Sequence, residues 1–436
     1  MKRRTLMDEW FSRRFEHGFP EYWRLARFGE VVANSAYGLG GDTGEIGPYP
    51  FLKMGNIVDG EILLADVDFC HVSGSDLKSA RLRRGELLFN RTNSAELVGK
   101  AGVWDSDEIA FAASYIVRFA ISIAANPDYL RHWWTLAAPR HRLTALATPG
   151  VQQVNINPTE LQRAFYVALP PRAEQDAICQ TIAHLDASFA ATKRLLNATH
   201  RRRQALLQQL LTGKRRLAGF GPTQSQINTA YGALPADWTF RAIGEFSDQS
   251  GERNAANAAL PVLSCTKSRG LVDSLSYFDR QVFSDDLTTY RLVRRGQFAY
   301  ATNHIEEGSI GYQDLYDTAV ISPMYTVFDA DSTAVNHRYL YLQLKTEKYR
   351  RIFAANTNSS VDRRGGLRWD DFARIQVPVP TPAEQAAIVA VAETADRELA
   401  LLERLLQAYR RQKRGLMQQL LTGKRRLPGF APTESP

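Results

Sequence analysis

The sequence predicts a mixed α/β protein built by internal duplication, with two similar domains that are each followed by a long amphipathic helix. Three observations carry this prediction. A fifteen-residue stretch, LLQQLLTGKRRLAGF at 206–220, returns as LMQQLLTGKRRLPGF at 416–430, with 13 identical positions. The segments that end in this stretch have a seven-residue apolar period, which is typical of coiled-coil helices. The segments between them mix short β-type runs with helical runs.

The repeat comprises a whole helix rather than a short motif. Without any gap, residues 170–220 and 380–430 are identical at 26 of 51 positions. Positions taken along each copy at alternating steps of four and three residues form one face of the helix, the seam. In this seam, seven of ten positions in the first copy and nine of ten in the second are apolar or aromatic. The seam of the first copy consists of Ile178, Ile182, Leu185, Phe189, Thr192, Leu196, Thr199, Arg203, Leu206 and Leu210, and that of the second consists of Ile388, Ala392, Ala395, Leu399, Leu402, Leu406, Tyr409, Lys413, Leu416 and Leu420.

The ends of both helices are marked in the sequence. Thr381 and Glu384 have the spacing of a capping box, and Pro382 stands at the first helical position, where a missing N–H costs nothing. Gly213 and Gly423 can supply the left-handed residue that ends a helix. Each helix is predicted to have about 39 residues and a length of roughly 58 Å.

An apolar strip of this length must be buried, and the other copy matches it in length and period. We therefore predict an intramolecular coiled coil. About 170 residues separate the two helices, so the sequence alone leaves parallel and antiparallel packing open. Arg203 and Lys413 occupy the same point of the two seams, where a cation either sets the register, extends to solvent or is merely tolerated at the edge.

The segments 20–169 and 235–379 are related but have diverged more than the helices. PEYWRLARFGEV (20–31) parallels PADWTFRAIGEF (235–246), and LRRGELLFNRTN (82–93) parallels VRRGQFAYATN (293–303). Trp23 and Trp238 are expected in the domain cores. ELLFN, SYIVRF, QFAYA and MYTVF are predicted strands, and 127–146 and 336–354 are predicted helices. Such a pattern suits two domains that recognise different targets on a common scaffold.

Composition and charge narrow the class of protein. The 436 residues carry a net charge of +8 and a pI near 9.3, which favours a nucleic-acid partner. The excess of positive charge lies in the repeated segments. Residues 172–216 include nine Lys/Arg and three Asp/Glu, and residues 382–426 include nine Lys/Arg and five Asp/Glu. Three separated cysteines without a CxxC pair argue against a disulfide framework or a zinc site and suit a reducing cytoplasm. A membrane span and a signal peptide are not expected.

Catalytic motifs are missing from the sequence. It has no HExxH motif and no Cys/His cluster, and its three Gly-Lys pairs are followed by Ala or Arg rather than by the Ser or Thr of a phosphate loop. The glycine-rich run GLGGDTGEIG at 38–47 is interpreted as a mobile loop rather than a nucleotide site. NINP at 155–158 lacks the second proline and the aromatic residue that a base-flipping adenine methyltransferase uses. We therefore expect no catalytic activity in this chain.

Several motifs in fixed order carry a family resemblance. Each half has a Pro-x-x-Trp entry, an Arg-Arg-Gly strand signal, a Pro-x-x-x-Glu-Gln helix start (170–175 and 380–385) and a Leu-Leu-Thr-Gly-Lys ending. In this order and twofold repetition, the chain resembles the specificity subunit of type I restriction-modification systems over nearly its whole length.

The resemblance implies two target-recognition domains held apart by antiparallel helices, each domain reading one half of a bipartite asymmetric DNA site. It implies two methyltransferase subunits and two restriction/translocase subunits as partners, with S-adenosylmethionine, ATP and Mg²⁺ used by those partners and no cofactor in this chain. Two alternatives are a subunit of a related system with a fused nuclease-methyltransferase, and a coiled-coil scaffold without DNA readout. The expected segments are an N-terminal arm (1–19), recognition domain 1 (20–169), the central helix (170–218), a linker (219–234), recognition domain 2 (235–379), and the C-terminal helix and tail (380–436).

Candidate base-reading residues are amides and arginines in loops that follow predicted strands, because these side chains can donate and accept at base edges. Structural turns use the same residue types, so a structural role is the simpler interpretation for any one candidate. The arginine-bearing loop at 362–368 is the strongest candidate. The full set comprises Asn90, Arg91, Asn93, Gln152, Gln153, Asn155, Thr302, Asn303, Asn358, Arg363, Arg364 and Arg368.

Basic clusters occupy the later part of each repeated helix. They are expected to contact phosphates, although a solvated helix face and a docking surface for a methyltransferase are alternatives. The cluster residues are Arg201, Arg202, Lys214, Arg215 and Arg216 in the first copy, and Arg410, Arg411, Lys424, Arg425 and Arg426 in the second.

Overall fold

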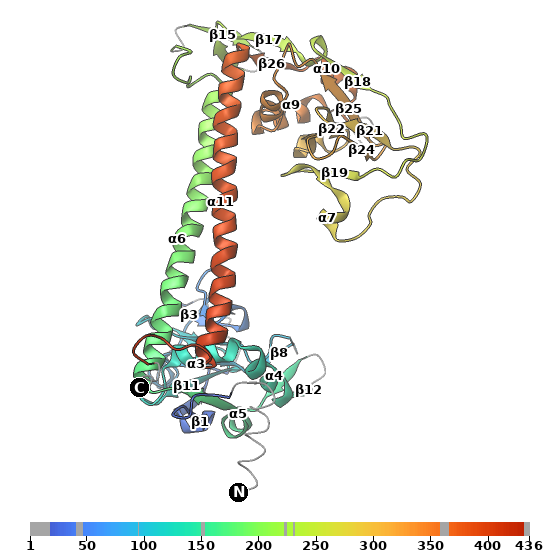
Figure 1. Ribbon diagram of the computed structural model, residues 1–436. Helices are drawn as coiled ribbons and strands as arrows, with labels where there is room; N and C mark the ends of the chain where they lie inside the picture. Colours follow the sequence, from blue (N-terminus) through green and yellow to red (C-terminus); the bar gives the residue numbers. More distant parts are fainter. Residues whose placement is uncertain are drawn as a thin grey trace, which may run out of the picture. The chain divides into compact units, whose positions relative to one another are not determined.

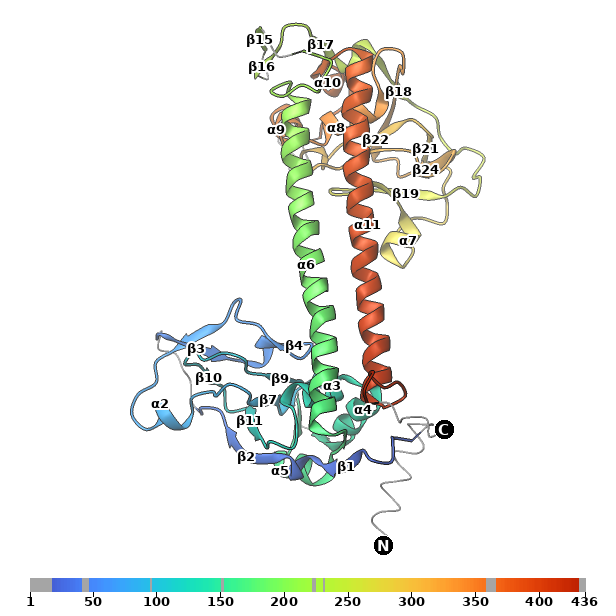
Figure 2. The same cartoon turned by 60° about the vertical axis from the view of Figure 1, so that its left-hand side comes forward.

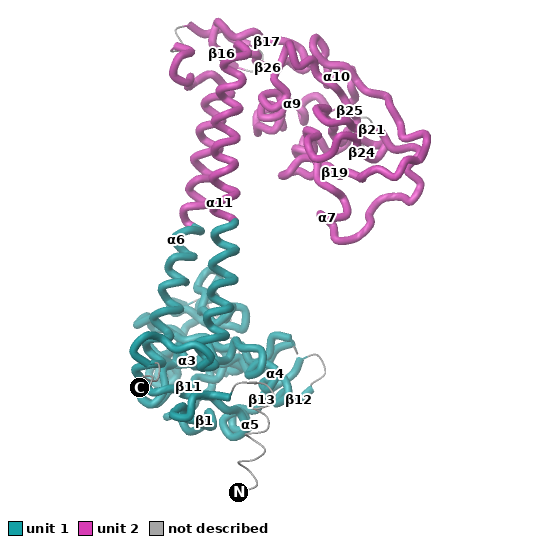
Figure 3. Tube along the Cα trace, viewed as in Figure 1, with its two compact units in different colours: residues 1–193, 404–436 teal, residues 194–403 magenta. Residues whose placement is uncertain are grey.

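The chain divides into two compact units that each contain one predicted domain and part of both long helices. The computed structural model describes residues 18–40, 47–94, 96–149, 153–221, 225–229, 232–357 and 366–430 (Figure 1). Unit 1 comprises residues 1–193 and 404–436, and unit 2 comprises residues 194–403 (Figure 3). The predicted N-terminal arm lies almost wholly outside the described residues.

The two repeated segments form the helices α6 (Arg172–Leu211) and α11 (Pro382–Leu421), each 40 residues long. Every predicted seam position on them is buried or half-buried. Within each unit the two helices lie side by side (Figures 1 and 2). Their contacts run in opposite directions along the chain: in unit 1, positions 174 and 186 of α6 meet 426 and 413, and in unit 2, positions 203 and 216 meet 396 and 384. The predicted coiled coil is confirmed, and its helices are antiparallel.

Unit 1 surrounds a four-stranded sheet of order β2-β11-β7-β9, beside the smaller sheets β10-β3-β6, β12-β13-β8, β1-β14 and β4-β5. The helices α3 and α4 belong to the same core as the sheet, as do apolar residues from the ends of α6 and α11. The elements are β1 (Arg24–Arg27), η1 (Phe28–Glu30), β2 (Val32–Tyr37), β3 (Tyr49–Leu52), η2 (Met54–Asn56), β4 (Ile57–Val58), β5 (Glu61–Ile62), β6 (Asp68–Cys70), α2 (Asp76–Ser79), β7 (Leu87–Asn90), β8 (Thr92–Asn93), β9 (Ala101–Val103), β10 (Phe111–Ala112), β11 (Ile116–Ile121), α3 (Pro127–Thr135), α4 (Ala137–Leu146), β12 (Ala147–Pro149), β13 (Val154–Ile156), α5 (Pro158–Ala164) and β14 (Tyr166–Leu169).

Unit 2 repeats this plan, since its sheet β18-β25-β22-β23 has the same strand order along the chain as the main sheet of unit 1. A second four-stranded sheet, β20-β19-β24-β21, and the pairs β17-β26 and β15-β16 complete it. The elements are β15 (Gln226–Thr229), β16 (Gly232–Pro235), β17 (Thr239–Ala242), η3 (Ile243–Glu245), β18 (Ser247–Ser250), β19 (Val262–Thr266), β20 (Gly270–Asp273), α7 (Ser274–Phe278), β21 (Arg291–Arg294), β22 (Phe298–Ala301), η4 (Ile305–Glu307), β23 (Ile310–Tyr312), β24 (Thr318–Ile321), β25 (Tyr325–Ala330), α8 (His337–Leu344), α9 (Glu347–Asn356), α10 (Trp369–Ala373) and β26 (Gln376–Val379).

The strands expected at ELLFN, SYIVRF, QFAYA and MYTVF are β7, β11, β22 and β25. By contrast, each predicted domain helix is two helices. The first breaks at Leu136, whose φ and ψ of −68° and 146° are extended, and Pro139 near the start of α4 has no N–H to continue the turn. The second breaks before α9, where the Thr346 side chain accepts a hydrogen bond from the amide of Tyr349 as a helix cap.

Local predictions at helix ends and in the connecting segments have mixed outcomes. Gly213 and Gly423 end their helices with φ of +65° and +71°, as expected. The capping box is half-formed: Glu384 donates its amide to Thr381 Oγ1 at 3.3 Å, but its carboxylate is bound elsewhere. The expected linker 219–234 includes β15 and most of β16, which pair antiparallel. Of the glycine-rich run, 41–46 lie outside the described residues; Gly38 and Gly47 lie where an added Cβ would be 2.1 Å from a strand carbonyl oxygen.

Candidate nucleic-acid interface

A buried ion pair in unit 2 joins the two long helices to the recognition domain. Arg216 Nε and Nη2 donate to Glu384 Oε1 and Oε2 at 2.8 and 2.7 Å, with side-chain exposures of only 5% and 2%. Trp238 Nε1 donates to the same carboxylate at 3.0 Å. The basic ending of α6 is thereby joined to the start of α11 and to the entry of the recognition domain.

Unit 1 contains the same clamp 210 residues away. Arg426 Nε donates to Glu174 Oε1 at 2.6 Å, and both side chains are buried. The Arg426 guanidinium carbon lies 4.7 Å from the ring centre of Tyr22 and 6.0 Å from that of Trp23. Trp23 and Trp238 are buried, as predicted.

For Arg216 and Arg426 the expected phosphate contact does not hold. Their guanidinium groups are buried and satisfied by carboxylates, and releasing either would leave a glutamate unpaired in the interior. Among the other cluster residues, Arg202 Nη2 binds Glu398 Oε2 at 2.9 Å, and the Arg410 guanidinium lies 5.2 Å from the Phe189 ring centre. The six that are exposed without an ion pair to any described residue are Arg201, Lys214, Arg215, Arg411, Lys424 and Arg425.

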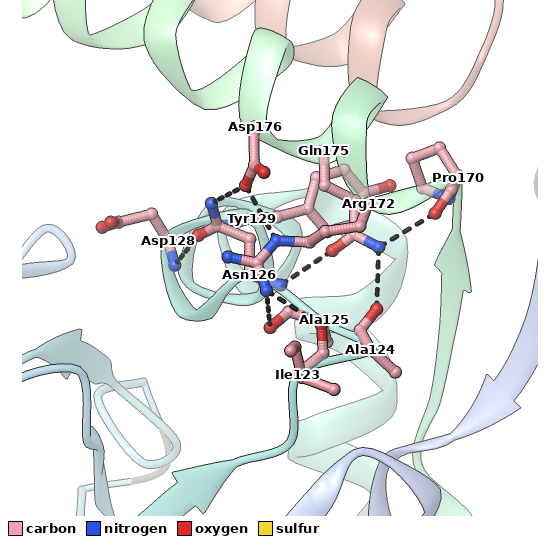
Figure 4. Close-up of polar contacts among 10 residues, drawn as sticks. All are labelled: Ile123, Ala124, Ala125, Asn126, Asp128, Tyr129, Pro170, Arg172, Gln175 and Asp176. Atoms are coloured by element: carbon pink, nitrogen blue, oxygen red, sulfur yellow. Dashed lines mark hydrogen bonds and ion pairs between the residues drawn. The ribbon is translucent and has the colours of Figure 1, made fainter.

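A second repeated clamp joins the start of each helix to its domain. Gln175 Oε1 accepts from the amide of Asn126 at 2.8 Å, and its Nε2 donates to the carbonyls of Pro170 and Ala124 at 2.9 and 3.2 Å (Figure 4). Asn126 in turn caps α3. In unit 2, Gln385 makes the matching bonds with the amide of Asn336 at 2.7 Å and the carbonyl of Pro380 at 2.8 Å.

The cations in the seam are paired with aspartates at matching positions. Lys413 Nζ lies 2.6 Å from Asp186 Oδ1 in unit 1, and Arg203 Nε lies 2.6 Å from Asp396 Oδ1 in unit 2. Arg203 lies 210 residues before Lys413, and Asp396 lies 210 residues after Asp186. This pairing supports the role in register, because slipping either helix would separate both charges from their partners.

In unit 1 the two predicted clusters of base-reading residues come together. β8 pairs with β13, so that Thr92 lies opposite Asn155 and Asn93 opposite Val154. Asn155 and Gln153 are exposed, and Arg91 and Thr92 are half-buried. We refer to Arg91, Thr92, Gln153 and Asn155 as the polar edge of unit 1.

Two other candidates of unit 1 face inward. Asn90 is fully buried, and neither polar atom of its carboxamide has a hydrogen-bond partner within the described ranges. Asn93 is 9% exposed, and its Oδ1 accepts from the amide of Ser94 at 2.9 Å. Burial removes both side chains from a base edge, so that expectation is corrected for Asn90 and Asn93. Gln152 lies outside the described residues.

Unit 2 has the same junction with different side chains. The amide of Leu367 donates to the carbonyl of Thr302 at 2.9 Å, just as the amide of Ile156 donates to the carbonyl of Arg91 at 2.8 Å. Thr302 Oγ1 donates to the carbonyl of Met324 at 2.8 Å. Asn303 is half-buried, and Arg368 is exposed next to the junction. Asn358, Arg363 and Arg364 lie outside the described residues.

Burial shifts the pKa of several titratable groups among the described residues. Burial raises the pKa of the Cys179 and Cys265 thiols to about 12 in each case, so both stay protonated at neutral pH. Burial also lowers the pKa of His132 well below its usual value. Among the described residues, His304, Glu306 and Glu307 have ligating atoms within 4.8 Å of one another, but Glu307 is bound to Lys267 at 2.6 Å. No described helix is long and apolar enough to cross a bilayer.

Known proteins support the relationship at low sequence identity. No family model matches the chain. The putative type I restriction enzyme MjaX specificity subunit of Methanocaldococcus jannaschii is 21% identical over 230 residues, which cover 52% of each chain. The type I restriction enzyme EcoKI specificity subunit of Escherichia coli is 25% identical over 210 residues, 47% of this chain and 44% of the relative. The chain thus spans about half the length of the curated relatives that it matches.

Solved structures extend the match to nearly the whole chain. A structure described as the "HsdS subunit from Thermoanaerobacter tengcongensis" aligns with a TM-score of 0.50 and 17% identity, over 93% of this chain and 98% of that one. The chain has the fold of type I specificity subunits. A second chain, from a study of complex assembly and conformational transition of the type I R-M system, aligns with a TM-score of 0.56 and 16% identity, over 93% and 99%. This specificity-subunit fold confirms the resemblance drawn from the sequence motifs.

Sequence reasoning missed both clamps and one aromatic contact of the polar edge. The Glu-Gln dipeptides at 174–175 and 384–385 were visible as a motif, but their partners lie far away in the sequence. The exposed Tyr37 ring centre lies 5.2 Å from the guanidinium carbon of Arg91. A single tyrosine at a strand end has no sequence signal for such a contact.

Proposed function

We propose that this chain is the DNA sequence-recognition subunit of a type I restriction-modification complex. Each recognition domain reads one half of a bipartite, asymmetric site, and the paired helices act as spacer and as docking site for methyltransferase subunits. The partners are double-stranded DNA, two methyltransferase subunits and two restriction/translocase subunits, in the cytoplasm. S-adenosylmethionine, ATP and Mg²⁺ act on those partner subunits, and this chain is not catalytic.

One observation carries the proposal. The clamps that join each domain to the helices are nearly the same in both units, whereas the side chains at the two polar junctions differ. Glu174–Arg426 corresponds to Glu384–Arg216, but Arg91 corresponds to Thr302. A scaffold used twice with different reading residues is what an asymmetric bipartite target requires, because each half of the site presents different base edges.

The exposed basic residues support a DNA partner. Lys214 and Arg215 in unit 2 and Lys424 and Arg425 in unit 1 follow the ends of the long helices and have no ion pair to the described residues. Such cations contribute affinity without sequence preference. The alternative of a scaffold without DNA readout gives no reason for these repeated free cations. The relatives and the solved structures named above come from type I systems, so a fused nuclease-methyltransferase partner is not favoured.

Methylation mapping tests this proposal. The chain is expressed with its methyltransferase partner in a host without adenine methylation, and the host genome is sequenced for modified bases. A single bipartite motif of two short half-sites with a fixed spacer is expected, and it should vanish when this gene is omitted. Methylation that persists without this chain, or that has a single continuous motif, would contradict the proposal.

A further inference from the structure

The polar edge of unit 1 contains an arginine, Arg91, that is held in place by its main chain and by one neighbouring aromatic ring. The main chain of Arg91 is held on both sides, since its amide donates to the carbonyl of Tyr115 at 3.1 Å and its carbonyl accepts from the amide of Ile156 at 2.8 Å. The residue therefore cannot drift as an arginine in an open loop would.

The half-buried side chain of Arg91 is held on one face by an aromatic ring. Its guanidinium carbon lies 5.2 Å from the ring centre of Tyr37, within the range of a cation–π contact. Its Nε is buried without a hydrogen-bond partner, and the guanidinium forms no ion pair with any described residue. By contrast, Arg84 and Arg118 of the same domain are both bound to carboxylates.

The chemistry of this arrangement suits a base edge better than a phosphate. A guanidinium fixed against an aromatic face keeps its planar fork of donors free along one side, and that fork matches the O6 and N7 acceptors of guanine in the major groove. A phosphate contact gains little from a pinned main chain and an aromatic support, because a mobile surface lysine or arginine serves equally well. The neighbouring Thr92, Gln153 and Asn155 add neutral donors and acceptors without any negative charge.

Unit 2 lacks both members of the contact. Thr302 stands at the position of Arg91, and its hydroxyl is already bound to the carbonyl of Met324. The pairing of β18 with β25 ends at Ser250, so Gly251 follows at the position of Tyr37 in β2. At these two matched positions, unit 1 therefore has the arginine and its aromatic support, and unit 2 has a threonine and a glycine.

We propose that Arg91 reads a guanine of the half-site bound by unit 1 and that Tyr37 is the positioning residue that holds its guanidinium for this contact. The inference rests on the proposed function and deepens it, since it names the base class read by one domain. Arg91→Lys keeps the positive charge but removes the planar fork of guanidinium donors. Tyr37→Leu removes the aromatic face, whereas Tyr37→Phe keeps it.

The test uses the full chain, a random duplex library to select its preferred sequence, and fluorescence anisotropy on duplexes that differ from it by single base pairs. We expect a guanine in one half-site whose replacement weakens wild-type binding by about 10- to 100-fold. Arg91→Lys and Tyr37→Leu should abolish or reduce this discrimination, with an unchanged salt dependence. Tyr37→Phe should behave as the wild type. Thr302→Ala, at the matching position of unit 2, should leave this guanine preference intact.

Each other outcome has a definite meaning. If Arg91→Lys weakens all duplexes equally and flattens the salt dependence, Arg91 contacts phosphate and the inference is wrong. If Tyr37→Leu keeps the full guanine preference, the positioning role is wrong. A wild-type chain that selects no sequence would overturn the proposed function itself and this inference with it. Circular dichroism of each variant checks that a change in binding does not come from unfolding.

Discussion

Removing Arg216 should destabilise unit 2 far more than removing an exposed arginine of the same helix pair. Arg216→Met leaves the carboxylate of Glu384, 2% exposed, without its cation in the interior. Breaking a buried ion pair in this way costs about 3–5 kcal/mol. Arg202→Met breaks the pair with Glu398, whose side chains are 70% and 41% exposed, and should cost only about 0–1 kcal/mol.

Hydrogen exchange of the full chain, followed by mass spectrometry, measures both effects where they occur. Peptides from the first turns of α11 should exchange faster in Arg216→Met by a factor that corresponds to the lost free energy, and peptides from the domain of unit 1 should change less. In Arg202→Met the same peptides should exchange nearly as in the wild type.

A double variant separates the missing cation from a general defect in folding. Combining Arg216→Met with Glu384→Leu removes the stranded charge and should recover most of the lost stability, minus about 1 kcal/mol for the lost acceptor of the Trp238 indole. If Arg216→Met costs no more than Arg202→Met, or if the double variant is as unstable as the single one, the clamp does not have the assigned energetic role.

Three further predictions concern the helix ends, the exposed cations and the spacer. Gly213→Ala should destabilise the protein by more than about 1 kcal/mol in thermal or chemical unfolding, because φ is +65° and the new Cβ would lie 2.3 Å from Pro235 Cγ. Gly415→Ala, inside α11 with open space around it, should instead stabilise the protein by about 0.5–1 kcal/mol. Replacing both Lys214 and Arg215 by Glu should lower the slope of log affinity against log salt by about 2 and leave sequence preference unchanged; an unchanged slope would remove their phosphate role. Inserting seven residues, roughly 10 Å of helix, at matched levels of both long helices should change the preferred spacer by about 3 base pairs in a site-selection assay, and a constant spacer would contradict the role of the helices as a ruler.

The long helices could be predicted because their seam is written twice and because few structures other than a coiled coil bury such a strip. Their antiparallel direction could not be derived from the sequence alone, since the connecting domain is long enough for either direction. The breaks at Leu136 and before Thr346 were missed because apolar residues on both sides kept a helical pattern, while the local Pro139 and the Thr346 cap interrupt the backbone.

The three cations of the Lys-Arg-Arg run at 214–216 differ in burial, which the sequence does not indicate. In sequence, three consecutive cations suggest one solvated cluster. In the structure the left-handed Gly213 turns the chain, and the amide of Arg215 bonds back to the carbonyl of Gln209 at 3.2 Å. This turn leaves Lys214 and Arg215 exposed and directs Arg216 inward, which only the distant Glu384 could have indicated.

The candidate interface shows the same limit. The strand pattern alone predicts that polar residues follow β7 and β22, but not that most of them are half-buried. That each meets a second segment some sixty residues further along the chain depends on tertiary pairing, which no local pattern specifies. The inward direction of Asn90 also depends on how β7 packs, since its side chain shares a face with the buried Leu88.

The central claim, that each domain reads its own half of one bipartite site, is tested most directly by exchanging a single domain. Residues 20–169 are replaced by the corresponding segment of a specificity subunit with a known target, and the methylation motif is mapped in the host described above. One half-site should change to the donor's sequence, while the other half-site and the spacer remain. A motif that changes in both halves, or in neither while methylation continues, would contradict it.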